Sequence, residues 1–445
     1  MAQRKILVLG TAYFHVLFTA GVVFGWAALE GCYLDLPQDG RDRIFTVAAS
    51  ANYLSNLFFG PFLDRYGATK CSGLACFIML LGALGMVAAE CRELVGSFRE
   101  IMVLLSFGTL GFAGPGVQMP TLRCELLFPE SASMVTSVNA SLFDASCVVF
   151  LLFQVLLMWC PSLDAKQLFI IYAAVMLLCL FSGQVLFRDL DRAHAKACEA
   201  QSYNVPNTPL MRNAGGATPR SPFGSGIFRD GSNLGSPGVN LDKAGSMKSG
   251  LLEHSKVVPF REAVRSFKFS YLVCFCAINI LRLNFVVMTL NTQLATFFKG
   301  DSATASMLTL TFSTLLPLGG LAAPLTALLL EKYRRWSYRV CLILSLIYGV
   351  CIAFPHVWMQ IAAYVIISVS RQLTYSIVFA LTSALFGQEH LGKLLAANNS
   401  VVFTVGLLQY PIAQLVGSSL LPSWFVVDMA MAALALPLLL SNGGL

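Results

Sequence analysis

Charged residues are scarce in this sequence. Only 12% of its 445 residues are Asp, Glu, Lys or Arg, whereas 56% are hydrophobic. A soluble domain of this length needs a larger polar surface, so the composition excludes a soluble globular protein. It indicates a chain that crosses a membrane many times and has little length left for a soluble catalytic domain.

Motifs that carry catalysis or hold cofactors are also missing. The sequence contains no glycine-rich nucleotide-binding loop and no catalytic-triad pattern. Its 13 cysteines are irregularly spaced and form no CxxC pair beside a histidine, so no zinc site or disulfide framework is expected. Cys32, Cys91 and Cys160 fall in predicted exterior loops. Two of them could form a disulfide, and the sequence does not decide whether they do. We expect no enzymatic activity, no metal and no cofactor.

The apolar residues are gathered in about a dozen segments, and crossing the hydrocarbon takes roughly 20 residues. We therefore predict an all-α membrane protein with twelve transmembrane helices in two six-helix halves around a central cavity. The first half is residues 1–188 and the second is residues 266–445. The predicted helices cover approximately residues 6–29, 44–63, 71–89, 101–119, 133–159, 168–187, 267–290, 307–330, 340–354, 358–381, 394–416 and 424–440.

Between the halves the composition changes to Ser, Gly, Asn, Pro and Lys, and residues 189–265 are predicted to form a disordered linker. Thr208, Thr218, Ser221 and Ser236 each precede a proline. A proline-directed kinase is therefore a candidate partner of the linker, although such pairs also arise by chance in unstructured segments.

Orientation follows from the distribution of the 30 Lys and Arg residues. Most of them fall on one side if the amino terminus is cytoplasmic, and the short loops favour this topology even without the linker. Both termini and the linker are therefore predicted to be cytoplasmic. The protein is expected in the plasma membrane or an organelle membrane, in contact with lipid and without a nucleic-acid partner.

A charged hinge separates the second and third predicted helices, reading GPFLDRYGATK over residues 60–70. Gly60 is expected to allow close helix approach and Gly67 a tight turn. Asp64 and Arg65 are expected to pair where a helix leaves the membrane, and Lys70 to lie beside anionic headgroups. We interpret these five residues as a conformational latch; the alternative is a polar loop that only marks topology.

The spacing of this hinge resembles the loop after the second helix of major facilitator superfamily transporters. Weak internal repetition agrees with two similar halves, since LDRY at 63–66 recurs as LEKY at 330–333, and LFPE at 127–130 as LFGQ at 385–388. The resemblance implies alternating access, in which one half rocks against the other around a fixed site near the midplane.

The ionisable residues that we select as candidates within predicted helices are Asp144, Arg282 and Arg371. Charges inside a membrane are costly, about 3 kcal/mol or more each, and are usually paired or face a cavity. An arginine there can bind a carboxylate through two hydrogen bonds, whereas Asp144 can serve proton coupling or simply neutralise one arginine. The predicted substrate-binding residues are Arg282, Arg371, Asn284, Tyr13, Phe14 and Tyr375.

Several stretches, among them LFDASCVVF at 142–150 and LRLNFVVMTLNTQL at 281–294, resemble the solute carrier family that includes sodium-independent large neutral amino-acid transporters. The resemblance covers roughly residues 5–188 and 266–440. It implies a small polar organic substrate, and we predict facilitative transport of neutral amino acids. A nucleobase carrier of the same fold and a non-transporting receptor or scaffold are the alternatives.

Overall fold

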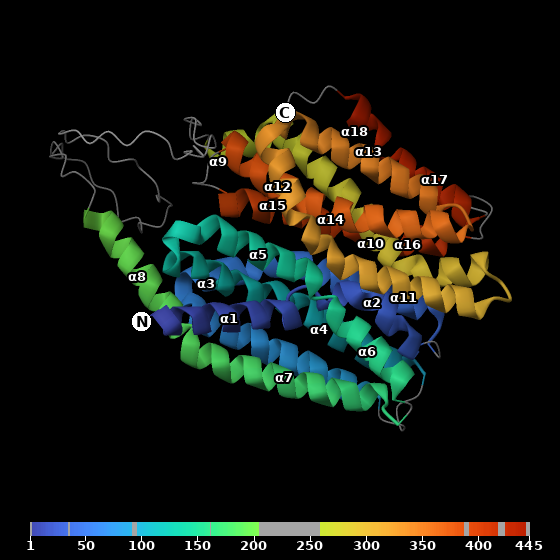
Figure 1. The fold of residues 1–445 in the computed structure, drawn as a ribbon, viewed down its shortest axis with the longest axis horizontal. Coiled ribbons are helices and arrows are strands. Elements are labelled where there is room, and N and C mark those ends of the chain that lie inside the picture. The colour runs from blue at the N-terminus through green and yellow to red at the C-terminus, as the bar shows by residue number, and fades with distance from the viewer. Residues whose placement is uncertain are drawn as a thin grey trace, which may run out of the picture.

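The computed structural model of the chain describes residues 2–33, 36–90, 96–160, 162–203, 259–386, 391–416 and 423–441. In these ranges the regular elements are all helices. Figure 1 shows the helices of the first half, blue to green, beside those of the second half, yellow to red. The all-α fold predicted from the sequence is thereby confirmed.

The first transmembrane pass is broken near its middle. Helix α1 (Ala2–Thr19) is followed by the 3-10 turn η1 (Val22–Gly25), the short helix α2 (Trp26–Leu29) and a second 3-10 turn, η2 (Glu30–Tyr33). The two parts meet at an angle of 45°. A Cβ atom on Gly21 would lie 2.7 Å from the carbonyl oxygen of Phe143, so glycine allows helix α5 to approach this break closely.

Helix α3 (Gln38–Ala89) contains two predicted transmembrane helices. Its 52 residues would extend about 78 Å, more than twice the thickness of the hydrocarbon, so it cannot be a single straight pass. The helix is interrupted at Gly67, whose φ of +85° and ψ of 172° are accessible essentially to glycine alone. The tight turn predicted at Gly67 is thus present.

The rest of the first half packs around α3. In chain order it comprises α4 (Ser97–Leu122), η3 (Arg123–Leu127), η4 (Pro129–Ser131), α5 (Ala132–Ala145), α6 (Val148–Trp159), α7 (Ala165–Leu186) and α8 (Arg188–Tyr203). Helix α8 continues from α7 and lies beside the amino terminus (Figure 1).

The second half begins with α9 (Phe260–Arg265) and the long, mostly buried α10 (Phe267–Phe297). It continues through α11 (Ser302–Leu318), η5 (Gly319–Ala322), α12 (Ala323–Lys332), α13 (Arg334–Ile352), α14 (Val357–Phe386), α15 (Leu391–Gly406), α16 (Gln409–Gln414), α17 (Trp424–Ala433) and α18 (Leu436–Leu440).

Both ends of the predicted linker are helical, which corrects the expectation of disorder from residue 189 to residue 265. Residues 188–203 form α8, and residues 260–265 form α9. The alanine-rich sequence of α8 favours a helix, and polar residues do not prevent one in a segment outside the membrane. The four proline-directed sites, Thr208, Thr218, Ser221 and Ser236, lie outside the described residues.

Seven helical stretches in the described ranges are long and apolar enough to cross a membrane, and the bent first pass adds an eighth. The predicted helices at 340–354 and 424–440 appear as shorter apolar helices, Trp336–Ile352 and Trp424–Leu440. The count of twelve passes stays a prediction.

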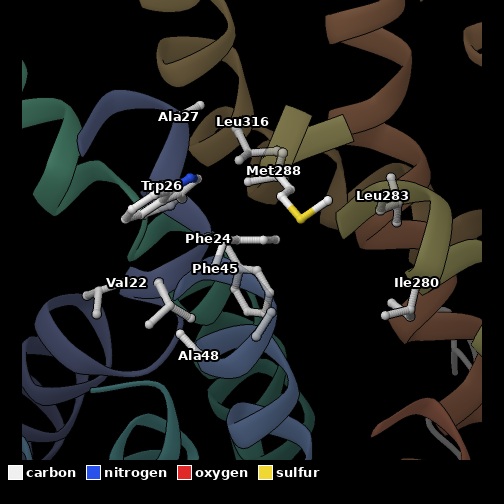
Figure 2. Packing of buried hydrophobic residues seen from close by; sticks show 14 of the residues in the cluster. Val22, Phe24, Trp26, Ala27, Phe45, Ala48, Ile280, Leu283, Met288 and Leu316 are labelled. Carbon is white, nitrogen blue, oxygen red and sulfur yellow. The ribbon is translucent and has the colours of Figure 1, made fainter. Parts of the chain in front are cut away.

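One hydrophobic core extends across both halves. In Figure 2, Phe24, Trp26 and Phe45 from the first half lie on one side, and Met288 and Leu283 of α10 on the other. Apolar packing therefore supports the polar contacts between the halves that are described next.

Candidate functional site

A buried ion pair connects the two halves at the level of the broken first pass. The Nε atom of Arg371 on α14 lies 3.1 Å from the Oδ1 atom of Asp144 on α5, and both side chains are buried. The guanidinium group also lies over the ring of Phe24, 4.3 Å from its centroid. Asp144 and Arg371 are thus paired, as one reading of the sequence expected.

Aromatic and amide groups surround this pair. The hydroxyl groups of Tyr53 on α3 and Tyr375 on α14 are 3.0 Å apart, and the amide nitrogen of Asn284 on α10 donates to Tyr53 over 3.5 Å. The ring of Phe143 meets that of Tyr375 edge-on at 6.1 Å. The central cluster, as we call it, comprises Phe24, Tyr53, Phe143, Asp144, Asn284, Arg371 and Tyr375.

Arg282, although on the same helix as Asn284, belongs to a different environment. Its guanidinium group donates to the hydroxyl group of Ser345 on α13 and, over 2.5 Å, to the Ser345 carbonyl oxygen. It also lies 4.9 Å from the ring centroid of Tyr348. Ser345 and Tyr348 lie on α13, whereas the partners of Arg371 are Asp144 and Phe24 of the first half, so the two arginines have separate sets of contacts. Its role in substrate binding stays a prediction.

Tyr13 and Phe14 lie on α1, away from the central cluster in sequence and in their contacts. The Tyr13 hydroxyl group donates to the carbonyl oxygen of Val135 over 3.3 Å, and Phe14 packs against Phe18 with ring centroids 4.6 Å apart. Both contacts stay within the first half. The assignment of these two residues to the substrate pocket is untested by the geometry.

The hinge is held by residues that the sequence did not suggest. Asp64 lies 3.9 Å from Arg123 at the end of α4, not beside Arg65 as expected. The guanidinium group of Arg65 lies instead over the Tyr66 ring, 5.4 Å from its centroid. Adjacent residues on a helix point in different directions, which explains why Asp64 and Arg65 do not pair.

Asp191 on α8 stabilises the chain just after Gly67. Its carboxylate accepts hydrogen bonds from the backbone nitrogens of Ala68 (2.5 Å) and Thr69 (3.1 Å) and from the Thr69 hydroxyl group (2.6 Å). Arg123 is 3.7 Å from the same carboxylate. Asp191 therefore caps the second part of α3 from another helix.

Two latch residues have less defined surroundings. A Cβ atom on Gly60 would meet no atom within 4 Å, so the close helix approach expected there is not present in this structure. Lys70 is exposed, which is compatible with the predicted headgroup contact without testing it.

Polar contacts also join the halves at the end of the bundle that holds η2 and the start of α3, which we call the acidic end. Asn291 on α10 donates to the Glu30 carboxylate over 2.7 Å. Tyr410 on α16 donates to Asp39 over 2.5 Å, and Gln414 donates to Asp42 over 3.4 Å. Glu30 and Asp42 are 0% and 1% exposed.

Sequence reasoning missed Phe24, Tyr53 and Phe143 in the central cluster, and Arg123 and Asp191 at the hinge. Aromatic residues are frequent in apolar segments, so nothing marked these three in advance. Arg123 and Asp191 lie in short polar segments after predicted helices, where charge normally indicates topology alone. Among the described residues, no group of His, Cys, Asp and Glu has the arrangement of a metal site.

No protein-family model matches the chain. Protein FMP42 of Saccharomyces cerevisiae is 26% identical over 439 residues, covering 85% of this chain and 82% of the yeast protein. Equilibrative nucleobase transporter 1 of Bos taurus is 24% identical over 492 residues, covering 97% of this chain and 94% of the bovine protein.

A crystal structure of a mutant of the peptide transporter POT superposes with a TM-score of 0.65 and 13% identity, covering 97% of this chain and 93% of that one. This likeness confirms the transporter-type arrangement of the fold. The narrower resemblance to amino-acid transporters stays a prediction, because the bovine relative is named as a nucleobase transporter. The chain is a multi-pass membrane protein of the transporter fold, and its relatives support a membrane transporter.

Proposed function

We propose that this protein carries a small, planar, polar organic solute of the nucleobase class across a membrane by alternating access. The single observation that supports this most is the composition of the central cluster. Its aromatic rings, amide and tyrosine hydroxyl groups come from both halves of the molecule and meet at one level.

A nucleobase is a flat heterocycle with alternating hydrogen-bond donors and acceptors on its edge. Phe24, Phe143 and Tyr375 offer ring faces and edges against which such a heterocycle packs. The amide of Asn284 and the hydroxyl group of Tyr53 supply both donors and acceptors, so they suit the edge of the base. No charged group on the substrate is needed.

Amino acids, the substrate class predicted first, fit the structure less well. Their carboxylate needs an available cation. Arg371 already forms an ion pair with Asp144, and Arg282 donates hydrogen bonds to Ser345. Binding an amino acid through Arg371 would require Asp144 to give way to the substrate. That exchange is physically reasonable, so amino-acid transport is retained as the second candidate.

Facilitative transport is proposed rather than pumping. The name of the bovine relative describes it as equilibrative, and its alignment extends over almost the whole of this chain. The hinge residues Gly60, Asp64, Arg65, Gly67 and Lys70 would then act on the rocking of the halves rather than bind the solute.

The experiment is uptake of radiolabelled adenine and of radiolabelled leucine into proteoliposomes that contain the purified protein. We expect saturable adenine uptake that unlabelled adenine inhibits and leucine does not. Empty liposomes and liposomes with heat-inactivated protein are the controls. Saturable leucine uptake that is indifferent to adenine would contradict the nucleobase proposal, and uptake of neither solute would favour the receptor or scaffold alternative.

Substitution of Asn284 tests the site itself. Asn284→Leu removes the amide from the central cluster at similar volume, and we expect the KM for adenine to rise at least about fivefold, since a lost hydrogen bond to a buried polar group costs about 1–3 kcal/mol. Asn399→Leu is the matched control, because Asn399 lies on α15 outside the cluster. Equal effects of the two substitutions on KM would show that the cluster does not bind the solute.

A further inference from the structure

The acidic end brings carboxylates of the first half against neutral side chains of the second half. The partners of Glu30, Asp39 and Asp42 across the junction are Asn291, Tyr410 and Gln414, respectively. An amide or a hydroxyl group donates a hydrogen bond without supplying positive charge. Closing this junction therefore removes the carboxylates of Glu30 and Asp42 from water without giving them a cation from the opposite half.

The cations available at this junction belong to the first half and are engaged by other carboxylates. The Nε atom of Arg41 lies 3.5 Å from Glu30, and an Nη atom of Arg43 lies 3.0 Å from Asp39 and 2.7 Å from Glu100 on α4. In the described structure Asp42 takes part in no ion pair. The titratable and charged groups that face it are the carboxylates of Glu30 and Asp39, the guanidinium group of Arg41 and the hydroxyl group of Tyr410.

Asp42 is the carboxylate with the poorest set of partners. It is 1% exposed, its Oδ2 atom accepts one long hydrogen bond of 3.4 Å from Gln414, and its Oδ1 atom has no hydrogen-bond partner. An ionised carboxylate in such a place bears most of the cost of leaving water. A proton on one oxygen removes the charge and converts the group into a neutral acid, for which one hydrogen bond is adequate.

We propose that Asp42 is a proton-binding site, occupied when the two halves meet at the acidic end and empty when they separate there. The proton comes from the water on that side and returns to the same side, because opening the junction is what exposes Asp42. The exchange alters how readily the halves close without moving a proton across the membrane. The consequence for solute movement rests on the proposed transport function, but proton binding itself does not.

The test that needs no substrate compares thermal unfolding of the purified wild-type protein and Asp42→Asn between about pH 5 and about pH 8.5, a range in which a solvated aspartate is ionised. Asparagine imitates the neutral acid. Folding of the wild type must take up a proton at Asp42, so its stability falls as the pH rises. The variant has no proton to take up at this position, so this contribution to the pH dependence is absent from it. We expect Asp42→Asn to have the higher melting temperature at alkaline pH and the difference to narrow steadily towards acid.

Asp301→Asn is the matched control. Asp301 is exposed and caps α11, and its hydrogen bonds from Thr304 lower its pKa. Its contribution to stability is present at neutral pH and fades as the pH falls through that lowered pKa, the opposite sign to Asp42. Asparagine is also a good N-cap, so we expect a small effect with no gain at alkaline pH. Parallel pH profiles for the wild type and Asp42→Asn would overturn the proposal, as would failure of Asp42→Asn to fold, which would show that the ionised form is needed.

Transport supplies the second readout. In adenine uptake assays, the wild-type rate should change with the pH on the side of the acidic end, and the Asp42→Asn rate should stay constant. An imposed pH gradient should cause no accumulation of solute above equilibrium in either protein. Accumulation driven by the gradient and abolished in Asp42→Asn would show that the proton crosses the membrane with the solute, contrary to same-side exchange. If neither protein transports adenine, the unfolding experiment still decides the proton site.

Discussion

The guanidinium group of Arg371 is held by two residues of the first half. Asp144 lies on one side of the guanidinium group, and the ring of Phe24 covers it at 4.3 Å. Because Asp144 and Phe24 belong to the first half and Arg371 to the second, relative movement of the halves must change both contacts. The pair is therefore a structural link between the halves as well as part of the central cluster.

Removing one member of this pair should be more harmful than removing both. Asp144→Asn leaves a buried guanidinium group without its carboxylate, for which a loss of about 3–5 kcal/mol in the free energy of unfolding is expected. Arg371→Gln in the same protein should restore part of that stability. Denaturation of the two single variants and the double variant in detergent measures the coupling. Additive effects would show that the two groups do not interact in solution.

Replacing Arg371 with lysine separates the two candidate substrate classes. Lysine keeps the positive charge near Asp144 but cannot form two parallel hydrogen bonds with a substrate carboxylate. We expect Arg371→Lys to retain adenine uptake within about threefold, a change of less than 1 kcal/mol. Loss of leucine uptake in the same variant together with intact folding, judged by size-exclusion chromatography, would favour a carboxylate-binding role and hence the amino-acid candidate.

At the scale of elements, α3 shows how one residue type divides a continuous helix. Gly67 adopts a backbone conformation that side chains make unfavourable, and a Cβ atom there would lie 2.7 Å from the Asp191 carboxylate. Gly60, seven residues earlier, is helical and has open space around its Cα atom. Two glycines of the same hinge thus have different physical reasons for being present.

The two glycines should respond oppositely to alanine. Gly67→Ala is expected to destabilise the protein by about 1–3 kcal/mol, because of the backbone strain and the contact with Asp191. Gly60→Ala should be neutral or should stabilise by up to about 1 kcal/mol, since alanine is the better helix former. Melting temperatures of both variants provide the comparison. A large destabilisation by Gly60→Ala would indicate that another conformation brings a neighbouring helix against this residue.

Asp64 tests whether the hinge acts as a latch. Asp64 is 72% exposed and its distance to Arg123 is 3.9 Å, so the pair contributes little to stability in this conformation. Asp64→Asn should slow transport while leaving substrate affinity, measured by isothermal titration, largely unchanged. An equal loss of rate and affinity would argue against a latch.

At the scale of the whole molecule, the sequence predicted the fold more completely than the site. Composition, apolar segments and the hinge spacing were sufficient for an all-α transporter fold, because each depends on local sequence. The Gly67 turn was predicted for the same reason. The partner of Asp64 was not predicted. Arg123 follows the end of α4, and only the packing of α3 against α4 brings it near Asp64.

In the site, too, residue types could be predicted from the sequence but their partners could not. The sequence selected Asp144, Arg371 and Asn284 by their polarity and Tyr375 as an aromatic pocket residue, and the structure brings these four into one cluster. It also selected Arg282 on the same grounds, but Ser345 holds that side chain within the second half. Residue type indicates that a membrane-embedded charge needs a partner; which partner it finds depends on the direction in which its helix faces.

The way in which helix α8 is attached to the rest of the molecule has a mechanical consequence. It is fastened near its start to two places, since Asp189 binds Arg4 at the amino terminus and Asp191 binds the chain after Gly67, while its far end leads into residues 204–258. A helix held near one end and loaded at the other can act as a lever. Tension, bulk or charge added to the segment that follows α8 would thus be delivered as torque to the turn within α3.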